Sequence, residues 1–404
     1  MPCVDTLWDR CTWEIELIVP RSIKVAADDG LEDIQVVEEL PILAIASGEL
    51  VEQVSHPHNS SQVIFHYAQS APTSAHHIGF AVGPFHILDL SPPPVDDAPV
   101  VEDGQAKLHA FCLPGFEAEL AHSVSFIRQA LDFYVTEFGS YPYSSYKLVF
   151  IDDTDRTSGV STIHNMATMT TFPAELLHSP AVIEQGLETR QILPHALACQ
   201  WVGINIIQKT WSDTWLVNGL AFRLSSLFLR KLLGLNEYKF RLKKDMIRCC
   251  SADMNMPPIC EPGIDHPPEI DVMSFINLKA PLVLHIMDQR LLKTGTSHGL
   301  SRVLPKVFLS AISGELRDAA ISTAQFLRIC KKVSGATDLK AFADQWIYAS
   351  GCPAFTVKAT FNRKKMAVEM TISQESPAWL YSCDKKTHWE DVAYVRPVEH
   401  FEVR

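Results

Sequence analysis

Two side chains that could take part in chemistry stand four residues apart, at His195 and Cys199. A metalloprotease helix of the H-E-x-x-H type places two histidines at i and i+4 on one face, with a glutamate between them as general base. Here the first histidine is present, Ala196 occupies the position of the base, and the cysteine occupies the position of the second histidine. The stretch therefore has the layout of a zinc-protease helix without its base and its second metal ligand.

The residues that follow this helix match one family. Gln200-Trp-Val-Gly comes directly after it, and Trp211-Ser-Asp-Thr-Trp-Leu-Val-Asn-Gly-Leu-Ala comes shortly afterwards. This order resembles the aminopeptidase N-like zinc peptidases, which read H-E-L-A-H-Q-W-F-G and then W-x-D-x-W-L-N-E-G-F-A. In that family the glutamate of N-E-G is the third metal ligand, and Asn218 stands at its position. A neutral amide is a poor zinc ligand because it brings no charge to offset the cation.

Two further site positions of the family are replaced as well. The family's G-A-M-E-N strand, whose glutamate holds the substrate's α-amino group, corresponds here to Ser161-Thr-Ile-His-Asn, so that His164 replaces the carboxylate. Asn277 stands where the family has the tyrosine that stabilises the tetrahedral intermediate. Losing even one such group usually slows a reaction by orders of magnitude. The resemblance therefore implies an aminopeptidase fold with no hydrolytic activity, no catalytic residue, no bound metal and no other cofactor.

The resemblance runs in the same order along most of the chain. Gly79–Phe85 resembles the closing strands of the family's N-terminal β-domain, Phe133–Pro142 its entry into the catalytic domain, and 351–353 the entry into a small β-domain. The implied fold class is α+β and multidomain. It comprises part of an N-terminal β-domain, a thermolysin-like, mainly helical aminopeptidase domain, and the start of a small C-terminal β-domain.

One non-peptidase branch of that superfamily has lost the same site groups, a subunit family of the general transcription factor TFIID. Pro2–Asp5, Cys11–Trp13 and Leu176–Ser179 resemble that branch and favour a fungal source. The resemblance implies a nuclear scaffold that supports TFIID assembly and core-promoter recognition for transcription initiation by RNA polymerase II. The expected partners are other TFIID subunits and, weakly for this segment alone, promoter DNA. Neither a membrane nor a small-molecule substrate is expected.

Two alternative functions stay open. The old cleft could capture peptide N-termini without cleaving them. The second alternative is an aminopeptidase-family enzyme with rebuilt chemistry, in which His195 and Cys199, on one helix face, form a base–thiol pair. As structural residues, the histidine is a core or pocket side chain and the cysteine a small buried hydrophobe. Trp201 and Trp215 are then packing residues, and Asp213 holds the turn before the next helix.

Length and composition fit a nuclear protein of two or three domains. The chain has 404 residues, of which 47% are hydrophobic, enough for large cores. No apolar run approaches the length of a membrane helix. The ten cysteines lack the spacing of a disulfide framework, which indicates reduced thiols in the nucleus or cytosol. Cys249, Cys250, Cys260 and His266 match no standard zinc spacing, so ordinary buried thiols are expected there.

Charge is distributed unevenly along the chain. Residues 1–105 carry 17 acidic and 3 basic side chains, whereas the remainder is nearly balanced and the whole chain has a formal net charge of −12. An acidic body does not attract phosphate, so any DNA or partner surface should lie beyond residue 106. The candidates are two basic clusters, namely Arg230, Lys231, Lys239, Arg241, Lys243, Lys244 and Arg248, and the turn Arg363, Lys364 and Lys365. The alternative for the first cluster is the solvated face of an amphipathic helix.

Sequence composition and periodicity, together with the family resemblance, predict four segments and one insertion. They are an N-terminal β-domain portion at 1–90 with an acidic insertion at 26–41, a Pro-rich acidic linker at 91–105, the aminopeptidase-like domain at 106–350, and a small β-domain portion at 351–404. Two-residue alternation predicts strands at Trp13–Val19 and Gln62–Tyr67. We also expect a strand at Lys147–Ile151, helices at Leu216–Leu233 and Ala280–Leu292, and a hairpin formed by Phe355–Phe361 and Met366–Ile372.

Overall fold

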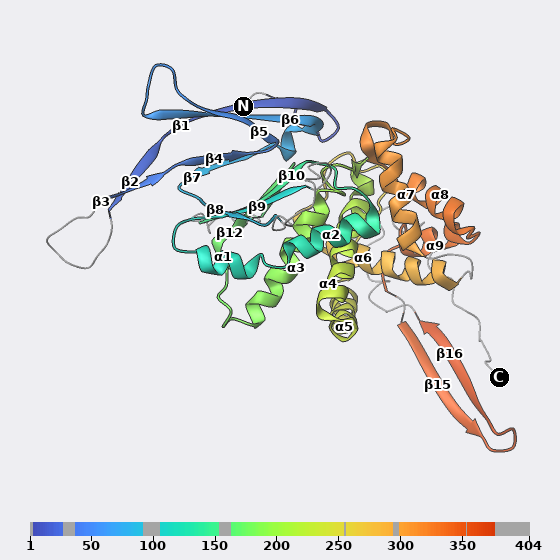
Figure 1. Ribbon diagram of the computed structural model, residues 1–404. Coiled ribbons are helices and arrows are strands. Elements are labelled where there is room, and N and C mark those ends of the chain that lie inside the picture. Colours follow the sequence, from blue (N-terminus) through green and yellow to red (C-terminus); the bar gives the residue numbers. More distant parts are fainter. Residues whose placement is uncertain are drawn as a thin grey trace, which may run out of the picture. The chain divides into compact units, whose positions relative to one another are not determined.

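A computed structural model describes residues 3–26, 37–91, 106–152, 163–253, 256–293, 299–352 and 354–375 (Figure 1). The chain forms two compact units, each assembled from separate stretches. Unit 1 contains Met1–Ile207, Leu224–Leu232 and Phe308–Ala320, and unit 2 contains Gln208–Arg223, Leu233–Val307 and Ile321–Arg404. Strands dominate the first part of the chain, helices the middle, and two strands follow. This order confirms the predicted α+β multidomain class, whereas the segment boundaries stay a prediction.

The first sheet of unit 1 joins three antiparallel strands in the order β1-β6-β5, with bounds Arg10–Pro20, Gln62–Ser74 and Glu49–Ser55. Every second residue of β6 from Val63 to Gln69 is buried, which is the period of a strand with one face in a core. The strands predicted at Trp13–Val19 and Gln62–Tyr67 are therefore confirmed.

Two smaller strand pairs complete this part of unit 1. β2 (Ser22–Ala26) pairs with β3 (Val37–Pro41), and β4 (Leu43–Ala46) pairs with β7 (Phe80–Gly83). The acidic insertion predicted for 26–41 is thus too long, because its last five residues form β3. A two-stranded edge pair tolerates carboxylates such as exposed Glu39, since they point into solvent. Residues 27–36 of that insertion and 92–105 of the predicted linker lie outside the described residues.

The second sheet of unit 1 has five strands in the order β11-β12-β10-β9-β8, with bounds His164–Met166, Met169–Pro173, Ser145–Ile151, Lys107–Cys112 and His86–Asp89. β10 is central, runs parallel to β9 and β12, and is buried along nearly its whole length. A strand covered on both faces is continuously apolar, which is why the run Lys147–Ile151 predicted it. Buried Lys147 donates from Nζ to the carbonyl oxygen of Ala46 at 2.7 Å, and burial lowers its pKa to about 8.

Three helices lie wholly in unit 1: α1 (Glu117–Ser123), α2 (Ile127–Phe138) and α3 (Glu184–Cys199). α3 contacts both of the others. α2 ends at Gly139, whose φ of 116° is a backbone conformation that residues with a side chain rarely adopt. Short 3-10 helices occupy Ala75–His77, Ala174–Leu176, Trp211–Asp213 and Arg317–Ala319.

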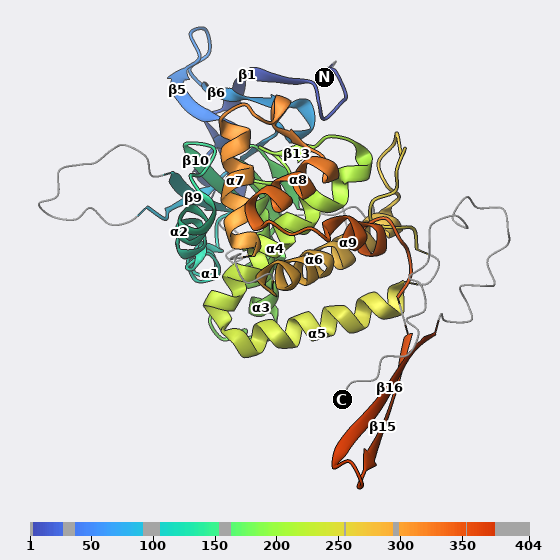
Figure 2. The ribbon, with the colours of Figure 1, turned by 90° about the vertical axis from the view of Figure 1, so that its right-hand side faces the viewer.

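Two helices contribute residues to both units, α4 (Thr214–Leu233) and α7 (Leu300–Ile312). Unit 2 also contains α5, α6, α8 and α9, with bounds Leu235–Ala252, Ile270–Lys293, Thr323–Ser334 and Leu339–Trp346. α5 and α6 pack side by side (Figure 2). The helices predicted at Leu216–Leu233 and Ala280–Leu292 lie within α4 and α6, and α6 begins ten residues earlier than predicted.

Four further strands are present in the described part of the chain. β13 (Ile207–Gln208) pairs with β14 (Ala320–Ile321), and β15 (Ala354–Asn362) forms an antiparallel hairpin with β16 (Ala367–Glu375). The predicted C-terminal hairpin is therefore confirmed, with its basic turn between the two strands.

The helix α6 is long and apolar enough to cross a membrane by length and composition, with a mean hydropathy of 1.4 over its most apolar window. The expectation that no run approaches this length was therefore wrong. The core helix of a soluble protein passes the same test. α6 carries a buried charged side chain, Lys279, which pairs with buried Asp253 at 2.8 Å. A buried ion pair within unit 2 fits a protein core, because an uncompensated charge is costly in an apolar environment.

Candidate functional site

The zinc-protease-like motif lies at the C-terminal end of α3, in unit 1. His195 and Cys199 are both partly buried, with Nε2 and Sγ 3.8 Å apart, as expected for positions four apart on one helix face. Ala196 lies between them and is only 1% exposed. Burial raises the pKa of the Cys199 thiol to about 12, so the thiol stays protonated at neutral pH. Because the thiolate is the nucleophile, the raised pKa of this thiol disfavours the base–thiol alternative.

Gln200, the residue after α3, is fully buried and binds the turn between β11 and β12. Its Oε1 accepts a hydrogen bond from the backbone N–H of Thr168 at 3.0 Å, and its Nε2 donates to the carbonyl oxygen of Met166 at 2.9 Å. Thr168 has a φ of 62°, in the left-handed region that residues other than glycine seldom occupy. One side chain therefore holds a strained turn by one backbone N–H group and one backbone carbonyl.

That turn follows the strand predicted to correspond to the family's amine-anchor strand. His164 begins β11, is exposed, and faces Thr171 of β12 in the ladder. No carboxylate stands at its position, so the strand offers no negative charge to a substrate's α-ammonium group. Ser161 and Thr162 of the predicted strand lie outside the described residues.

Trp201 is a packing residue, as predicted. It is 2% exposed, and its ring meets those of Tyr141 and Tyr134 edge-on at centroid distances of 5.0 and 5.6 Å. Its Nε1 donates to the carbonyl oxygens of Gly139 and Ser140 at 3.4 and 3.2 Å. The tryptophan thereby joins the end of α3 to the end of α2.

Asn218 and Asn277, predicted to stand at the positions of the third metal ligand and of the oxyanion donor, both lie in unit 2 and contact each other. Nδ2 of Asn218 on α4 donates to Oδ1 of Asn277 on α6 at 2.8 Å, and it also lies 3.4 Å from the sulfur of Met273. The two amides satisfy each other as neutral partners. They bring no negative charge to this place, which a zinc ligand set would need.

The W-x-D-x-W segment in unit 2 is held by one buried carboxylate. Oδ1 of Asp213 accepts from the backbone N–H and the hydroxyl of Thr323, at 2.7 and 2.8 Å, and Oδ2 accepts from the hydroxyl of Thr210 at 2.8 Å. Trp215 is fully buried and donates from Nε1 to the same Thr323 hydroxyl at 3.0 Å. Asp213 therefore fixes the turn before α4, as predicted, and also ties it to the start of α8.

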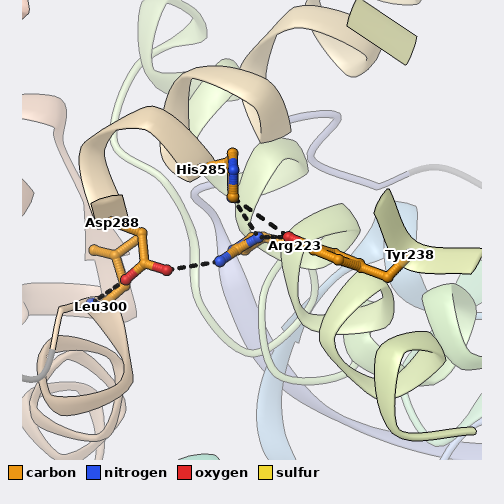
Figure 3. Close-up of polar contacts among 5 residues, drawn as sticks. All are labelled: Arg223, Tyr238, His285, Asp288 and Leu300. Atoms are coloured by element: carbon orange, nitrogen blue, oxygen red, sulfur yellow. Dashed lines mark hydrogen bonds and ion pairs between the residues drawn. The ribbon is translucent and has the colours of Figure 1, made fainter. Parts of the chain in front are cut away.

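A buried polar network in unit 2 went unnoticed in the sequence (Figure 3). Arg223 of α4 is 5% exposed; its Nη2 donates to Asp288 at 2.7 Å and its Nη1 donates to the Tyr238 hydroxyl at 2.6 Å. Nδ1 of His285 lies 3.3 Å from Nη1. Burial and the guanidinium lower the pKa of His285. The network joins α4, α5 and α6, and its one carboxylate, Asp288, is already paired with Arg223. We therefore interpret the network as a contact that holds these three helices together.

The group Cys249, Cys250, Cys260 and His266 does not gather into a metal site among the described residues. Cys260 lies 3.7 Å from the Thr323 hydroxyl, and Nδ1 of His266 lies 3.1 Å from the carbonyl oxygen of the next residue. Cys352 donates from Sγ to Asp253 at 3.0 Å. Across the described residues, no group of three or more His, Cys, Asp or Glu side chains could hold a metal ion.

The two basic clusters differ in how many of their charges are already paired. Arg241 pairs with Glu237 at 2.7 Å, and Arg248 lies 3.8 Å from Asp245. At the hairpin turn, Nζ of Lys365 pairs with Glu369 at 3.0 Å. Lys231 stacks over the Phe133 ring at 5.1 Å. The exposed cations for which the described structure gives no ion pair are Lys239, Lys243, Lys244, Arg363 and Lys364.

Comparison with known proteins identifies the relatives of this chain. Residues 122–277 match the peptidase family M1 domain. The chain is 36% identical over 409 residues to transcription initiation factor TFIID subunit 2 of Schizosaccharomyces pombe, which covers 93% of this chain and 34% of that protein. It is 31% identical over 385 residues to TFIID subunit 2 of Saccharomyces cerevisiae, and the matched region covers 88% of this chain and 26% of that protein. The chain thus spans about a third or less of the length of these curated relatives, and the predicted resemblance is confirmed.

Solved structures agree on the fold. An M1 zinc metallopeptidase mutant from Deinococcus radiodurans, bound to a Tyr-Ser-Ala substrate, superposes with a TM-score of 0.62 at 18% identity, over 88% of this chain and 67% of that one. Similarity at this level of identity shows the fold alone. The fold of the M1 metallopeptidases is therefore present in this chain.

Proposed function

Because this chain belongs with the TFIID subunit 2 relatives of the M1 peptidases, we propose that it serves as a catalytically inactive scaffold within that subunit. The compartment is the nucleus, where a general transcription factor acts. The partners are the other TFIID subunits. The scaffold supports assembly and core-promoter recognition for transcription initiation by RNA polymerase II.

The observation that carries the proposal is the chemistry at the old site positions. Ala196 has no polar group, the Cys199 thiol is protonated because it is buried, and the Asn218 and Asn277 amides bond each other. A catalytic zinc site needs three protein ligands and a base that activates water. His195 alone matches a ligand. The helices around these positions are nevertheless well packed, since Trp201 and Trp215 are both buried.

Capture of peptide N-termini is the less favoured function. Binding an α-ammonium group without a carboxylate leaves its charge uncompensated, and exposed His164 supplies none. A second reason is the neutral Asn218–Asn277 pair, which adds no negative charge in unit 2.

Promoter DNA is a weak ligand of this segment in our proposal. Lysines contact phosphates without reading bases, and each paired cation adds less to counterion release. The basic clusters of α5 and of the β15–β16 turn each contain cations that are already paired. We therefore expect duplex binding by this chain alone to be weak, strongly salt-dependent and nearly without sequence preference, because cations that contact only phosphates act through counterion release.

Zinc content and hydrolysis test the catalytic half of the proposal. We expect purified protein dialysed against a mild chelator to hold far less than one zinc per chain, and to release no product from aminoacyl-amide substrates. His195→Ala should change neither result, because one imidazole holds zinc weakly. An active M1 aminopeptidase carried through the same dialysis is the control. Stoichiometric zinc that is lost in His195→Ala would overturn the proposal.

Assembly tests the scaffold half. The tagged full-length protein should co-purify with TFIID subunits from nuclear extract, and crosslinks should map partners onto the described surfaces of this chain. A chain that is absent from TFIID fractions, or that shows no crosslink within its 404 residues, would contradict the scaffold role.

A further inference from the structure

α5 has an outward face that a solvated amphipathic helix does not require. Its inner residues Leu242 and Cys249 belong to the core cluster formed with α6. On the outer side, Phe240 is 63% exposed and Ile247 is 58% exposed. These two positions are seven apart and therefore lie on one face, about 10 Å apart along the helix axis. Large apolar side chains grouped on a surface mark a contact site more often than single ones do.

Lysines surround these two apolar side chains. Lys243 and Lys244 lie between them at the third and fourth positions after Phe240, and Lys239 precedes it. All three are exposed. In the described part of the chain these lysines make no ion pair, whereas Arg241 and Arg248 on the same helix are paired with carboxylates. The face therefore combines two exposed apolar side chains with positive charge between and beside them.

We propose that this face of α5, defined by Phe240, Ile247 and the three lysines, docks an acidic amphipathic helix of a partner protein. The inference rests on the proposed scaffold function and names the kind of partner that this surface takes. Large apolar side chains of the partner pack against Phe240 and Ile247, where water is displaced. Its aspartates and glutamates pair with the lysines and speed association through complementary charge.

The same face is poorly matched to duplex DNA. Phosphates are contacted by cations and hydrogen-bond donors. The side chains of Phe240 and Ile247, which flank Lys243 and Lys244, are neither. A duplex would also leave Phe240 in water or force it against charged backbone. Charge complementarity and apolar area together select an acidic protein helix, because only such a partner satisfies both parts of the face.

Binding of a designed probe tests the proposal. The probe is a fluorescein-labelled helical peptide with leucines at every third and fourth position and glutamates elsewhere, measured by anisotropy against the full chain. We expect saturable binding that weakens by at least about tenfold in the double variant Phe240→Ser, Ile247→Ser, because central apolar contacts dominate interface affinity. The triple variant with Lys239, Lys243 and Lys244 changed to Glu should weaken it as strongly.

Matched controls separate this face from general stickiness. Leu309→Ser with Ile312→Ser removes equally exposed apolar groups from α7, which are 53% and 66% exposed. Changing the exposed Lys331, Lys332 and Lys340 to Glu removes the same charge from α8 and α9. Both controls should bind the probe as the wild type does. A scrambled peptide of the same composition should bind at least about tenfold more weakly.

Three outcomes would overturn the inference. The first is equal loss in the control variants or equal binding of the scrambled peptide, since the contact would then be nonspecific. The second is a labelled duplex that loses affinity on lysine reversal while the peptide does not, because the face would then bind DNA. The third is unchanged peptide binding in the Phe240, Ile247 variant. Circular dichroism of each variant checks that it is folded.

Co-purification separates failure of this inference from failure of the scaffold function. If wild-type chain enters TFIID and the α5 variants enter it with unchanged crosslinks, the inference is wrong and the scaffold function stands. If the wild-type chain itself does not enter TFIID, the proposed function is wrong, whatever the peptide shows.

Discussion

Replacing Gln200 by methionine removes two hydrogen bonds from a fully buried site and leaves the side-chain volume almost unchanged. The backbone N–H of Thr168 and the carbonyl oxygen of Met166 then lose these hydrogen bonds in the protein interior. Each buried polar group left without a partner costs about 1–3 kcal/mol. Gln200→Met should therefore lower the free energy of unfolding by roughly 2–6 kcal/mol. The left-handed Thr168 adds to the effect, because strain persists only where surrounding bonds hold it.

Urea unfolding monitored by tryptophan fluorescence measures this loss, and amide hydrogen exchange locates it. Exchange at Thr168 should accelerate more than exchange in β10. The control is Gln129→Met on the exposed side of α2, which should change stability by less than about 0.5 kcal/mol. Gln200→Glu is a second informative variant: it keeps an acceptor for Thr168 but sets a carboxylate oxygen against the Met166 carbonyl, so it should also destabilise. If Gln200→Met unfolds within 0.5 kcal/mol of the Gln129 control, the turn is not held by this side chain and the reasoning fails.

Three further predictions concern buried groups. Asp288→Asn leaves the buried Arg223 guanidinium without its counter-charge and should cost about 3–5 kcal/mol in urea unfolding; a loss below 1 kcal/mol would contradict a buried pair. Trp215→Phe should cost roughly 1 kcal/mol for the lost bond to Thr323, and Trp215→Ala about 3–5 kcal/mol, so equal losses would refute this packing. Burial lowers the pKa of His77 from 6.5 to about 4, so the unfolded chain binds more protons between these values. Stability should fall as pH drops from 6.5 to 4, less steeply in His77→Asn, and an unchanged slope would exclude that cause.

The local elements could be predicted from the sequence because their signals are local. Trp13–Val19 alternates with the period of a strand, and Ala280–Leu292 repeats with the period of a helix. The basic turn of the C-terminal hairpin also lies between two alternating runs. The assignment of residues to the old site positions rests on a motif of fixed spacing and stays a prediction.

The long-range contacts could not be predicted from spacing. Arg223 and Asp288 are 65 residues apart, and Asp213 and Thr323 are 110 residues apart, so no local pattern pairs them. The outward position of Phe240 was also missed, because an apolar residue in an amphipathic helix is expected to face the core. Burial depends on which surfaces meet in three dimensions, and a single sequence does not state this.

The hydrogen bond between Asn218 and Asn277 should make this contact in unit 2 insensitive to pH and to zinc concentration. Primary amides neither titrate in the physiological range nor bind zinc with useful affinity, so this contact between α4 and α6 has nothing to release on acidification or chelation. A metallopeptidase of the same fold loses its central ion to a chelator. Here the corresponding contact is an ordinary neutral bond, so the local geometry should be the same whether cellular zinc is scarce or abundant.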